Sequence, residues 1–220
     1  MIAIDPKSGD PADRVPGLVR AKGAEAGIRT EIIPRLQSTL SVYGLDFASE
    51  LIFQGDAGTT SAGRPSRRVG FEFSNYYKPT DWLTIDADIA YAKARFRDND
   101  AVGRRIPGAV EGVASLAAAV DNLGPYFGAL QLRYFGPRPL IEDNSIRSKS
   151  TTTLNGRVGY KIGPDLSVEV EGFNLLNSKS SAIDYYYQSR LPNEGPDGQN
   201  DIHFHPIESR SARVTLNARF

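Results

Sequence analysis

The sequence predicts an all-β protein of antiparallel strands, and three observations support this prediction. Apolar residues recur at alternate positions in one segment after another, which is the period of a strand whose two faces meet different surroundings. Short and long connections between these segments alternate strictly. The longest apolar run, residues 113–120, has about eight residues, and a membrane-spanning helix needs roughly 18 to 20. A helical membrane protein is therefore not expected.

The first half of the chain shows the clearest alternation. The predicted strands there are 23–32, 36–43, 68–77 and 83–91. A turn at Pro34 and Arg35 joins the first two strands, and a turn at 78–81 joins the next two. In the last of them, Leu83, Ile85, Ala87, Ile89 and Tyr91 share one face. Asp86 and Asp88 occupy the opposite face.

The second half repeats this pattern. Its predicted strands are 126–134, 154–162, 166–171 and 212–220, with a tight turn at 163–165. Residues 112–120 are ambiguous, because their three consecutive alanines favour a helix by propensity. The number of connections on either side favours a strand, which brings the predicted total to about nine.

Charge is confined to one face of these predicted strands. The apolar faces carry no charged residue over the predicted spans, whereas the opposite faces carry many acids and bases. A soluble β-sandwich follows the same rule, with its charged face in water, so alternation alone does not separate it from a membrane barrel.

Composition excludes several function classes. The chain is 40% hydrophobic and 24% charged, as in ordinary folded proteins. Lys plus Arg is 26 and Asp plus Glu is 26, so no basic field favours nucleic acid as a partner. The absence of cysteine removes disulfides, zinc–cysteine sites and thiol nucleophiles.

Three features favour a membrane barrel over a sandwich. Short links near 34–35, 78–81, 121–125 and 163–165 alternate with long ones near 54–67, 97–107, 136–150 and 177–209, as periplasmic turns and extracellular loops do. Aromatic residues gather near both strand ends, as in interface girdles. Those beside the short turns are Tyr76, Tyr77, Trp82, Tyr126, Phe127 and Tyr160, and those toward the long loops are Tyr43, Tyr91, Phe96, Tyr134 and Phe135. The third feature is a final strand that ends on Phe220.

Several segments resemble TonB-dependent outer-membrane receptors. The most specific are Phe173–Asn177, Ile183–Pro192, Asp201–Pro206 and Ala218–Phe220, which resemble the C-terminal end of such a receptor. Residues 67–72, 107–109 and 133–140 resemble earlier parts of the same barrel. The resemblance, from about residue 22 onward, implies an active transporter whose barrel of about 22 strands surrounds a plug.

The resemblance implies an incomplete receptor, because nine strands do not make the even number with which these barrels close. Residues 1–21 are expected to be the remnant of an extracellular loop. Residues 22–220 are expected to be the C-terminal part of the barrel, without the plug domain and the N-terminal box that contacts the TonB complex.

The implied function is TonB-dependent import of a scarce or chelated nutrient, of the siderophore, cobalamin or carbohydrate class, across the bacterial outer membrane. The implied partners are outer-membrane lipid and lipopolysaccharide, the barrel-assembly machinery, a small-molecule ligand and the TonB complex. A passive porin-like or adhesive barrel, or a soluble β-sandwich binding module, is the alternative.

The extracellular rim is the place where ligand contacts are expected. Its candidates are Tyr185, Tyr186, Tyr187, His203 and His205. The tyrosines suit stacking on a sugar or an aromatic ligand, although packing at the rim explains them as well. The two histidines, with Asp201, form a weak metal-site pattern, and hydrogen bonding in a loop is the favoured interpretation.

Other charged candidates have simpler explanations. The carboxylate pairs Asp86/Asp88 and Glu169/Glu171 suit a solvated barrel wall better than acid–base catalysis. Lipopolysaccharide phosphates or an anionic ligand are possible partners for the basic residues beside long loops, for which ordinary solvation is an equal alternative. These are Arg67, Arg68, Arg104 and Arg105. No catalytic residue, cofactor site or metal site is predicted.

The end of the chain is the strongest single candidate. Val214, Leu216 and Ala218 share one face of the last predicted strand, and Phe220 continues their alternation. In the family that this chain resembles, a terminal aromatic residue after such a face is part of the signal that the barrel-assembly machinery recognises.

Overall fold

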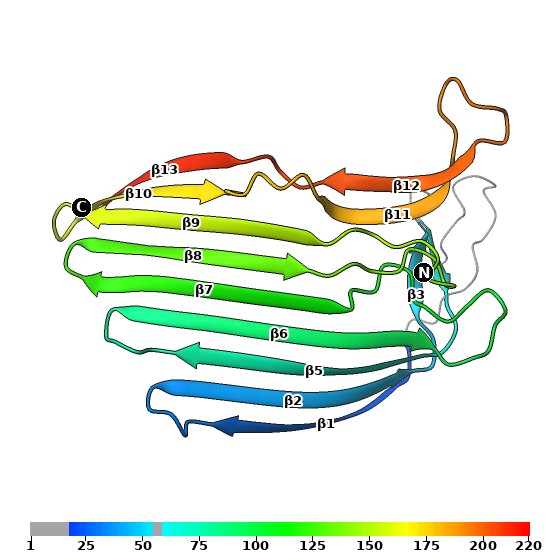
Figure 1. The fold of residues 1–220 in the computed structure, drawn as a ribbon, viewed down its shortest axis with the longest axis horizontal. Helices are drawn as coiled ribbons and strands as arrows, with labels where there is room; N and C mark the ends of the chain where they lie inside the picture. The colour runs from blue at the N-terminus through cyan, green and yellow to red at the C-terminus, as the bar shows by residue number, and fades with distance from the viewer. Residues whose placement is uncertain (1–17, 55–58) are drawn as a thin grey trace.

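The computed structural model describes residues 18–54 and 59–220, and more than half of these residues lie in strands. Nine of the strands in this part of the chain form one antiparallel sheet, in the order β1-β2-β5-β6-β7-β8-β9-β10-β13 (Figure 1). Their bounds are β1 Ala21–Thr30, β2 Leu36–Phe47, β5 Ser66–Tyr77, β6 Leu83–Phe96, β7 Gly112–Leu123, β8 Tyr126–Phe135, β9 Thr151–Lys161, β10 Leu166–Phe173 and β13 Ser211–Ala218. The predicted all-β antiparallel fold is confirmed.

Two small hairpins lie outside this sheet, in connections that the sequence pattern left as loops. They are β3 Leu51–Gln54 with β4 Thr59–Ala62, and β11 Ser181–Ser189 with β12 Gln199–Pro206. The predicted long loops 54–67 and 177–209 are therefore partly strands. Neither hairpin has the strict apolar–polar alternation of the main strands, so the two-residue period did not reveal them.

The alanine-rich segment is a strand, as the count of connections predicted. β7 pairs with β6 on one side and with β8 on the other, so its backbone is hydrogen-bonded along both edges. These two ladders outweigh a helix preference of only a few tenths of a kcal/mol per residue.

The connections alternate as predicted. The short turns lie together at the end of the sheet drawn at the left, and the long connections lie together at the opposite end (Figure 1). Left-handed backbone at Arg35, with φ of 64°, and at Gly124, with φ of 60°, closes two of the short turns.

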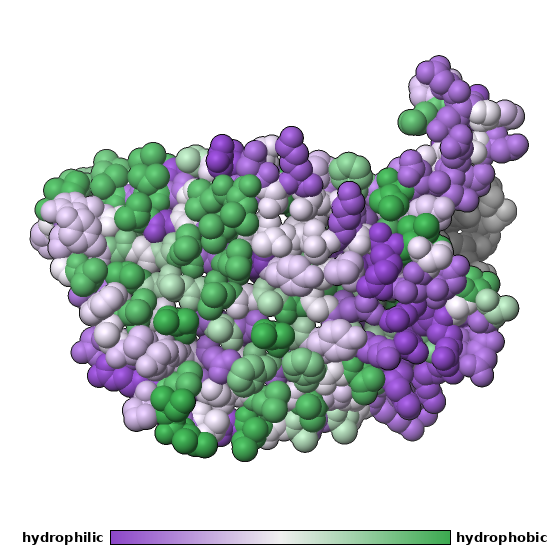
Figure 2. All heavy atoms as spheres, in the orientation of Figure 1, coloured by the Kyte–Doolittle hydropathy of each residue, from purple (hydrophilic) through white to green (hydrophobic). Residues whose placement is uncertain are grey.

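The register gives the sheet one apolar face. Ile28, Leu40, Phe73 and Ile89 are neighbours in one row across four strands, and all four side chains are exposed. Figure 2 shows hydrophobic residues gathered over the strands and hydrophilic ones toward the end with the long connections. The opposite, polar face carries Glu72, Asp88, Arg133 and their register neighbours.

The sheet does not close into a barrel or fold over a core. β1 and β13 are its two open edges. The accessible surface is 15006 Å², whereas a compact protein of this mass exposes roughly 9,900 Å². The buried apolar residues of the described ranges are Ala94, Phe96, Ile106 and Leu140. This surface excess indicates that the apolar face meets something other than this chain.

The aromatic residues divide between the two faces. Tyr77, Tyr91, Tyr126, Tyr134 and Tyr160 lie on the apolar face near the strand ends, as girdles require. The alternation of side chains along the strands places others on the polar face. These are Tyr43, Tyr76, Phe96, Phe127 and Phe135. The sequence analysis placed these aromatic residues by their distance from the strand ends, and that distance does not show on which face of the sheet a side chain lies.

The charge rule also changes at the strand ends. β1, β2, β5 and β6 extend beyond their predicted spans, and the added apolar-face positions other than Gly44 are charged. These positions are Lys22, Asp46, Arg67, Lys93 and Arg95.

The first predicted region, residues 1–21, falls mostly outside the described residues, and β1 begins at Ala21. The described ranges contain no helix that is long and apolar enough to cross a membrane.

Candidate functional site

The β11–β12 hairpin carries all five candidate ligand-contact residues. It rises from the end of the sheet that holds the long connections (Figure 1). Tyr185 pairs with His203, Ile183 with His205, and Tyr187 with Asp201, so these six residues share one face of the hairpin. Tyr186 pairs with Ile202 on the other face. Four of the five candidates are therefore brought together, and Tyr186 is separated from them.

Two of these residues form a stacked pair. The rings of Tyr187 and His203 lie 3.9 Å apart between centroids with an interplanar angle of 16°. The His203 Nε2 atom is buried and has no hydrogen-bond partner. This pair places a phenol ring and an imidazole ring together on one face of the hairpin, and aromatic rings suit contact with a planar or partly apolar ligand.

The same histidines do not form a metal site with the side chains that the structure describes. In residues 18–54 and 59–220, no three His, Cys, Asp or Glu side chains lie close enough together to hold a metal ion. His203 instead stacks on the ring of Tyr187.

An ion pair anchors the hairpin to the sheet. The Arg138 guanidinium lies 3.0 Å from the Asp184 carboxylate, with side-chain exposures of 14% and 7%. Arg138 also donates to the Ala182 carbonyl at 3.3 Å, and the Thr151 hydroxyl donates to the Ser181 carbonyl at 2.8 Å. These contacts fix the base of β11 against the connection between β8 and β9.

Sequence reasoning did not identify Arg138 and Asp184 as functional residues. Arg138 lies within the segment 133–140 that resembles the receptor family, between Pro137 and Pro139. This is the only available signal, because a contact across 46 residues leaves no periodic pattern.

A second ion cluster joins the long connections to one another. Arg64 lies 2.9 Å from Glu142, 3.1 Å from Asp100 and 3.3 Å from Asp98. Its guanidinium also lies 4.1 Å above the centre of the buried Phe96 ring. One arginine thus links the connections that follow β4, β6 and β8.

One carboxyl group of this cluster, Asp100, titrates below its ordinary range. The backbone N–H of Val102 donates to its carboxylate at 2.9 Å, and this bond lowers the pKa of Asp100 most. Burial opposes this shift with the second-largest effect, and the nearby Arg64 lowers the pKa further through a hydrogen bond and its charge.

The basic candidates beside the long loops differ in their contacts. Arg68 pairs with Glu50, and Arg105 pairs with Glu111, which also binds Arg147. Arg67 binds Asp46 through two contacts of 2.6 and 2.8 Å. Arg104 contacts Asn99 at 3.4 Å. Three of the four candidate arginines, Arg67, Arg68 and Arg105, therefore form ion pairs within the protein.

The acidic candidates lie on the polar face of the sheet. Arg157 lies 3.4 Å from Glu169, and Arg213 lies 2.5 Å from Glu171. These pairs neutralise the β10 carboxylates, as expected of structural charge in a barrel wall. Asp86 and Asp88 lie on the same face of β6.

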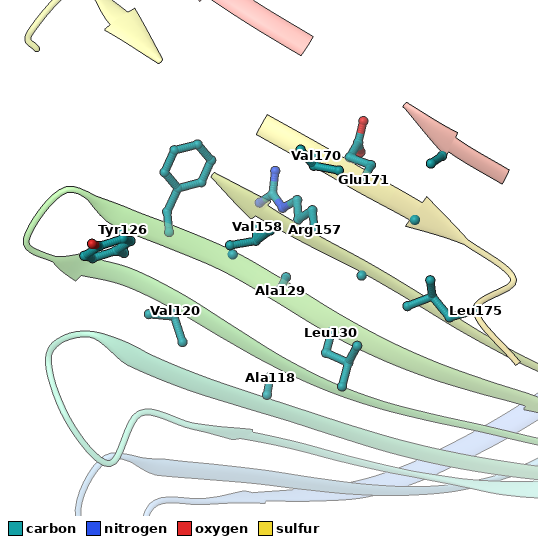
Figure 3. A pocket seen from close by; sticks show the side chains of 15 residues that line it. Ala118, Val120, Tyr126, Ala129, Leu130, Arg157, Val158, Val170, Glu171 and Leu175 are labelled. Carbon is teal, nitrogen blue, oxygen red and sulfur yellow. The ribbon is translucent and has the colours of Figure 1, made fainter. Parts of the chain in front are cut away.

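The segment after β10 packs back onto the apolar face. Asn174 is buried and bonds to Asn155, Ser178 and the Glu208 carbonyl, and its φ is 47°. This turn places Leu175 against Gly172 and Gly156. Leu175 and Leu130 line an open depression of about 730 Å³ (Figure 3).

The four residues of the expected assembly signal lie at the β13 edge. Val214 pairs with Val170, Leu216 with Val168 and Ala218 with Leu166, all on the apolar face. Val214 and Leu216 are 70% and 66% exposed, and Phe220 is fully exposed. Their exposure leaves them accessible to another protein.

Comparison with known proteins identifies the architecture. The sequence profile of the family described as TonB dependent receptor-like, beta-barrel, matches residues 10–175. The fold is similar to that of the ferric-catecholate import receptor Fiu from E. coli K12, with a TM-score of 0.69 and 19% identity over 92% of this chain and 28% of that one.

Two further receptors have similar folds. The ferric yersiniabactin uptake receptor FyuA from Yersinia pestis gives a TM-score of 0.70 and 15% identity, over 92% of this chain and 30% of that one. The FrpB iron transporter from Neisseria meningitidis gives 0.66 and 16%, over 92% of this chain and 31% of that one. The chain thus spans less than a third of the length of these structures, and at such identities the likeness concerns the fold.

Proposed function

The chain belongs to the TonB-dependent receptor-like β-barrel family, and from this premise we propose that it forms part of the wall of a bacterial outer-membrane receptor that imports a chelated nutrient. The observation that carries the proposal is the match of this family over 166 residues, 10 to 175, on a sheet whose apolar face is exposed. Among the siderophore, cobalamin and carbohydrate classes, the names of Fiu and FyuA favour an iron chelate.

The apolar band has a length that suits a membrane. On β6 it runs from Leu83 to Tyr91, which is roughly 27 Å along the strand at about 3.4 Å per residue. A strand tilt of about 40° reduces this to a little over 20 Å along the membrane normal, close to the roughly 25 Å band of outer-membrane barrels.

This chain contributes two things to the proposed import: residues that contact the ligand, and part of the barrel wall. The rings of Tyr185, Tyr187 and His203 lie on one face of the β11–β12 hairpin, where a planar chelate can stack. The proposed role involves no bond making or breaking.

The test is uptake under iron starvation in the host, with the gene intact or deleted. We expect deletion to abolish uptake of one ferric chelate, and inactivation of TonB to have the same effect. The protein itself is expected in the outer membrane, with heat-modifiable mobility. Leakage of small solutes that needs no TonB would identify a passive porin instead and contradict the proposal.

A matched pair of variants tests the hairpin. Tyr185→Ala combined with Tyr187→Ala is expected to weaken chelate binding by about tenfold or more, the loss expected for two stacking rings. Tyr186→Ala, on the opposite face, is the control and should bind as the unchanged protein does. Equal weakening by both variants would argue against a ligand-contact face.

A further inference from the structure

The β11–β12 hairpin is set apart from the main sheet. It forms a two-stranded sheet of its own, and neither of its strands pairs with β10 or β13 (Figure 1). A two-stranded hairpin without further support is only marginally stable in water. The position of the hairpin relative to the sheet therefore depends on side-chain contacts from the neighbouring connections.

Arg138 makes two of these contacts through one atom. Its Nη2 donates to the Asp184 carboxylate at 3.0 Å and to the Ala182 carbonyl at 3.3 Å. Both side chains of the ion pair are largely buried, and the buried Nε of Arg138 has no hydrogen-bond partner in the part of the chain that the structure describes. Because a buried charge without its partner is costly, the ordered position of the hairpin depends on both members of this pair.

Arg138 contacts the hairpin on the side that faces away from the aromatic candidates. Asp184 and Tyr185 are adjacent in β11, so the alternation of side chains directs them to opposite faces. We refer to the face that carries Tyr185, Tyr187 and His203 as the ring face. A ligand on the ring face and the Arg138 guanidinium thus contact different sides of the hairpin, and Arg138 affects the ligand only through the hairpin.

The backbone that carries Arg138 is itself fixed. Its N–H donates to the Ser148 hydroxyl at 3.0 Å, and the Ser148 N–H donates to the Arg138 carbonyl at 2.9 Å. Pro139 is fully buried, and Ser148 is buried as well. The anchor is therefore a well-packed part of the β8–β9 connection, and not a loosely held loop.

We infer that Arg138 is a positioning residue for ligand binding. Through Asp184 it holds the ring face in the orientation in which a chelate that carries aromatic rings stacks on it. The hairpin is then ordered before the ligand arrives, so that the ordering cost is not subtracted from the affinity. This role rests on the proposed function, because the ring face meets such a chelate only in a receptor.

The size of the effect follows from the population of the ordered hairpin. Without the anchor, we expect the marginally stable hairpin to spend about a tenth of its time in the ordered position, which lowers the apparent affinity about tenfold. Most of this loss should appear in the association rate constant, because the ligand binds only after the hairpin has returned to its ordered position.

The experiment measures binding of the iron(III) complex of catechol to the protein at its full natural length, purified from outer membranes into detergent. The test variants are Arg138→Ala and Asp184→Asn, which disrupt the pair from either side. Arg138→Lys is the rescue variant, because one ammonium group can replace the single Nη2 that makes both contacts. Lys149→Ala is the control, because Lys149 is an exposed cation of the same connection and forms no ion pair with the described residues.

Both test variants should bind the complex about tenfold more weakly than the unchanged protein does. Arg138→Lys should recover most of the affinity, and Lys149→Ala should leave it unchanged. Weak binding by Arg138→Ala together with full binding by Asp184→Asn would identify a direct contact between Arg138 and the ligand, and would overturn the positioning role. Equal affinity of Arg138→Ala and the unchanged protein would also overturn it, as would equal weakening by Lys149→Ala.

Two further measurements separate the positioning role from damage to the fold and from the proposed function. Heat-modifiable mobility reports whether the barrel has folded, and Asp184→Asn, which keeps the shape of the side chain, decides the test should Arg138→Ala fail to fold. A protein that imports a ferric chelate with the help of TonB but does not bind the catechol complex overturns the positioning role alone. A protein that imports no chelate overturns the proposed function and the positioning role with it.

Discussion

Phe127 and Gly159 meet on the polar face of the sheet, and their contact restricts what the β8–β9 pair tolerates. They are register partners, and a Cβ on Gly159 would meet three ring carbons of Phe127. The ring therefore occupies the space that a side chain at position 159 would need. Gly159→Val should force the ring away and lower the free energy of unfolding by about 1–3 kcal/mol.

This change is measured as a shift in the urea midpoint of unfolding from detergent micelles. Gly163→Ala is the control, because nothing lies within 4 Å of a Cβ at that turn position. Replacing Phe127 by Ala in the Gly159→Val background should recover part of the loss. A midpoint that Gly159→Val leaves unchanged would show that the ring moves without cost.

Asp100 makes the long connection after β6 sensitive to acid. Its folded pKa lies below the ordinary value, chiefly because Val102 donates a backbone hydrogen bond to it and also because Arg64 is near. A depressed pKa means that the ionised form stabilises the loop above about pH 4, and that this stabilisation is lost as the pH falls through the folded pKa.

The hydrogen-exchange rate of residues 97–107, corrected for intrinsic rates, should therefore increase as the pH is lowered from 5 to 2.5, because protonation of Asp100 weakens its hydrogen bond with the Val102 N–H. Asp100→Asn should exchange faster at pH 5 and depend less on pH over the same interval. A wild-type loop whose corrected exchange is constant down to pH 2.5 contradicts this assignment.

At the scale of elements, the ion pair between Arg138 and Asp184 holds the hairpin of β11 and β12 in place. Removing one partner of a largely buried pair leaves the other charge without compensation, and this lowers the stability of the hairpin by about 3 kcal/mol. Arg138→Ala should therefore loosen the hairpin and leave the main sheet intact. Exchange of the β11 and β12 amides should increase about a hundredfold, which corresponds to that loss.

The control for this prediction is Arg210→Ala. Arg210 is exposed in the connection to β13 and forms no ion pair with the described residues. Exchange that increases equally in both variants, or in β8 and β9 as well, would mean that the pair does not act on the hairpin specifically.

The elements also differ in how far periodicity predicted them. The strands of the main sheet were predictable because each separates an apolar surface from a polar one, which imprints a two-residue period. β7 was ambiguous because its alanines favour a helix, and the ladders of β6 and β8 decided the outcome. β11 is rich in tyrosine, a strand-favouring residue, yet without a sharp contrast between its faces it was expected as loop.

At the scale of the whole molecule, the last strand is the element on which membrane assembly is expected to depend. Its apolar-face residues Val214, Leu216 and Ala218 lead to the fully exposed Phe220. Deleting Phe220 should lower the yield of heat-modifiable protein in the outer membrane, because the terminal aromatic residue is proposed to contact the assembly machinery. Exchanging Phe220 for Tyr keeps an aromatic ring and should preserve the yield. Equal yields with and without Phe220 would refute the assignment.

The amino-acid sequence by itself determined the strands of the main sheet, the side of each strand that excludes charge over its predicted span, and the end of the sheet that carries long connections. These follow from local alternation, which every strand records independently of its neighbours. Tertiary structure alone decided which residues share a site. Tyr185, Tyr187 and His203 meet because β11 and β12 pair in one register, and Tyr186 is excluded from that face by the same pairing.

The row of Lys22, Arg67 and Arg95 and the anchor at Arg138 have the same origin. Lys22, Arg67 and Arg95 lie far apart in the chain and come to one level of the sheet through the registers of β1, β2, β5 and β6. Arg138 reaches Asp184 across 46 residues. Contacts between distant segments depend on register and on loop path, and no local period in the sequence records either of them.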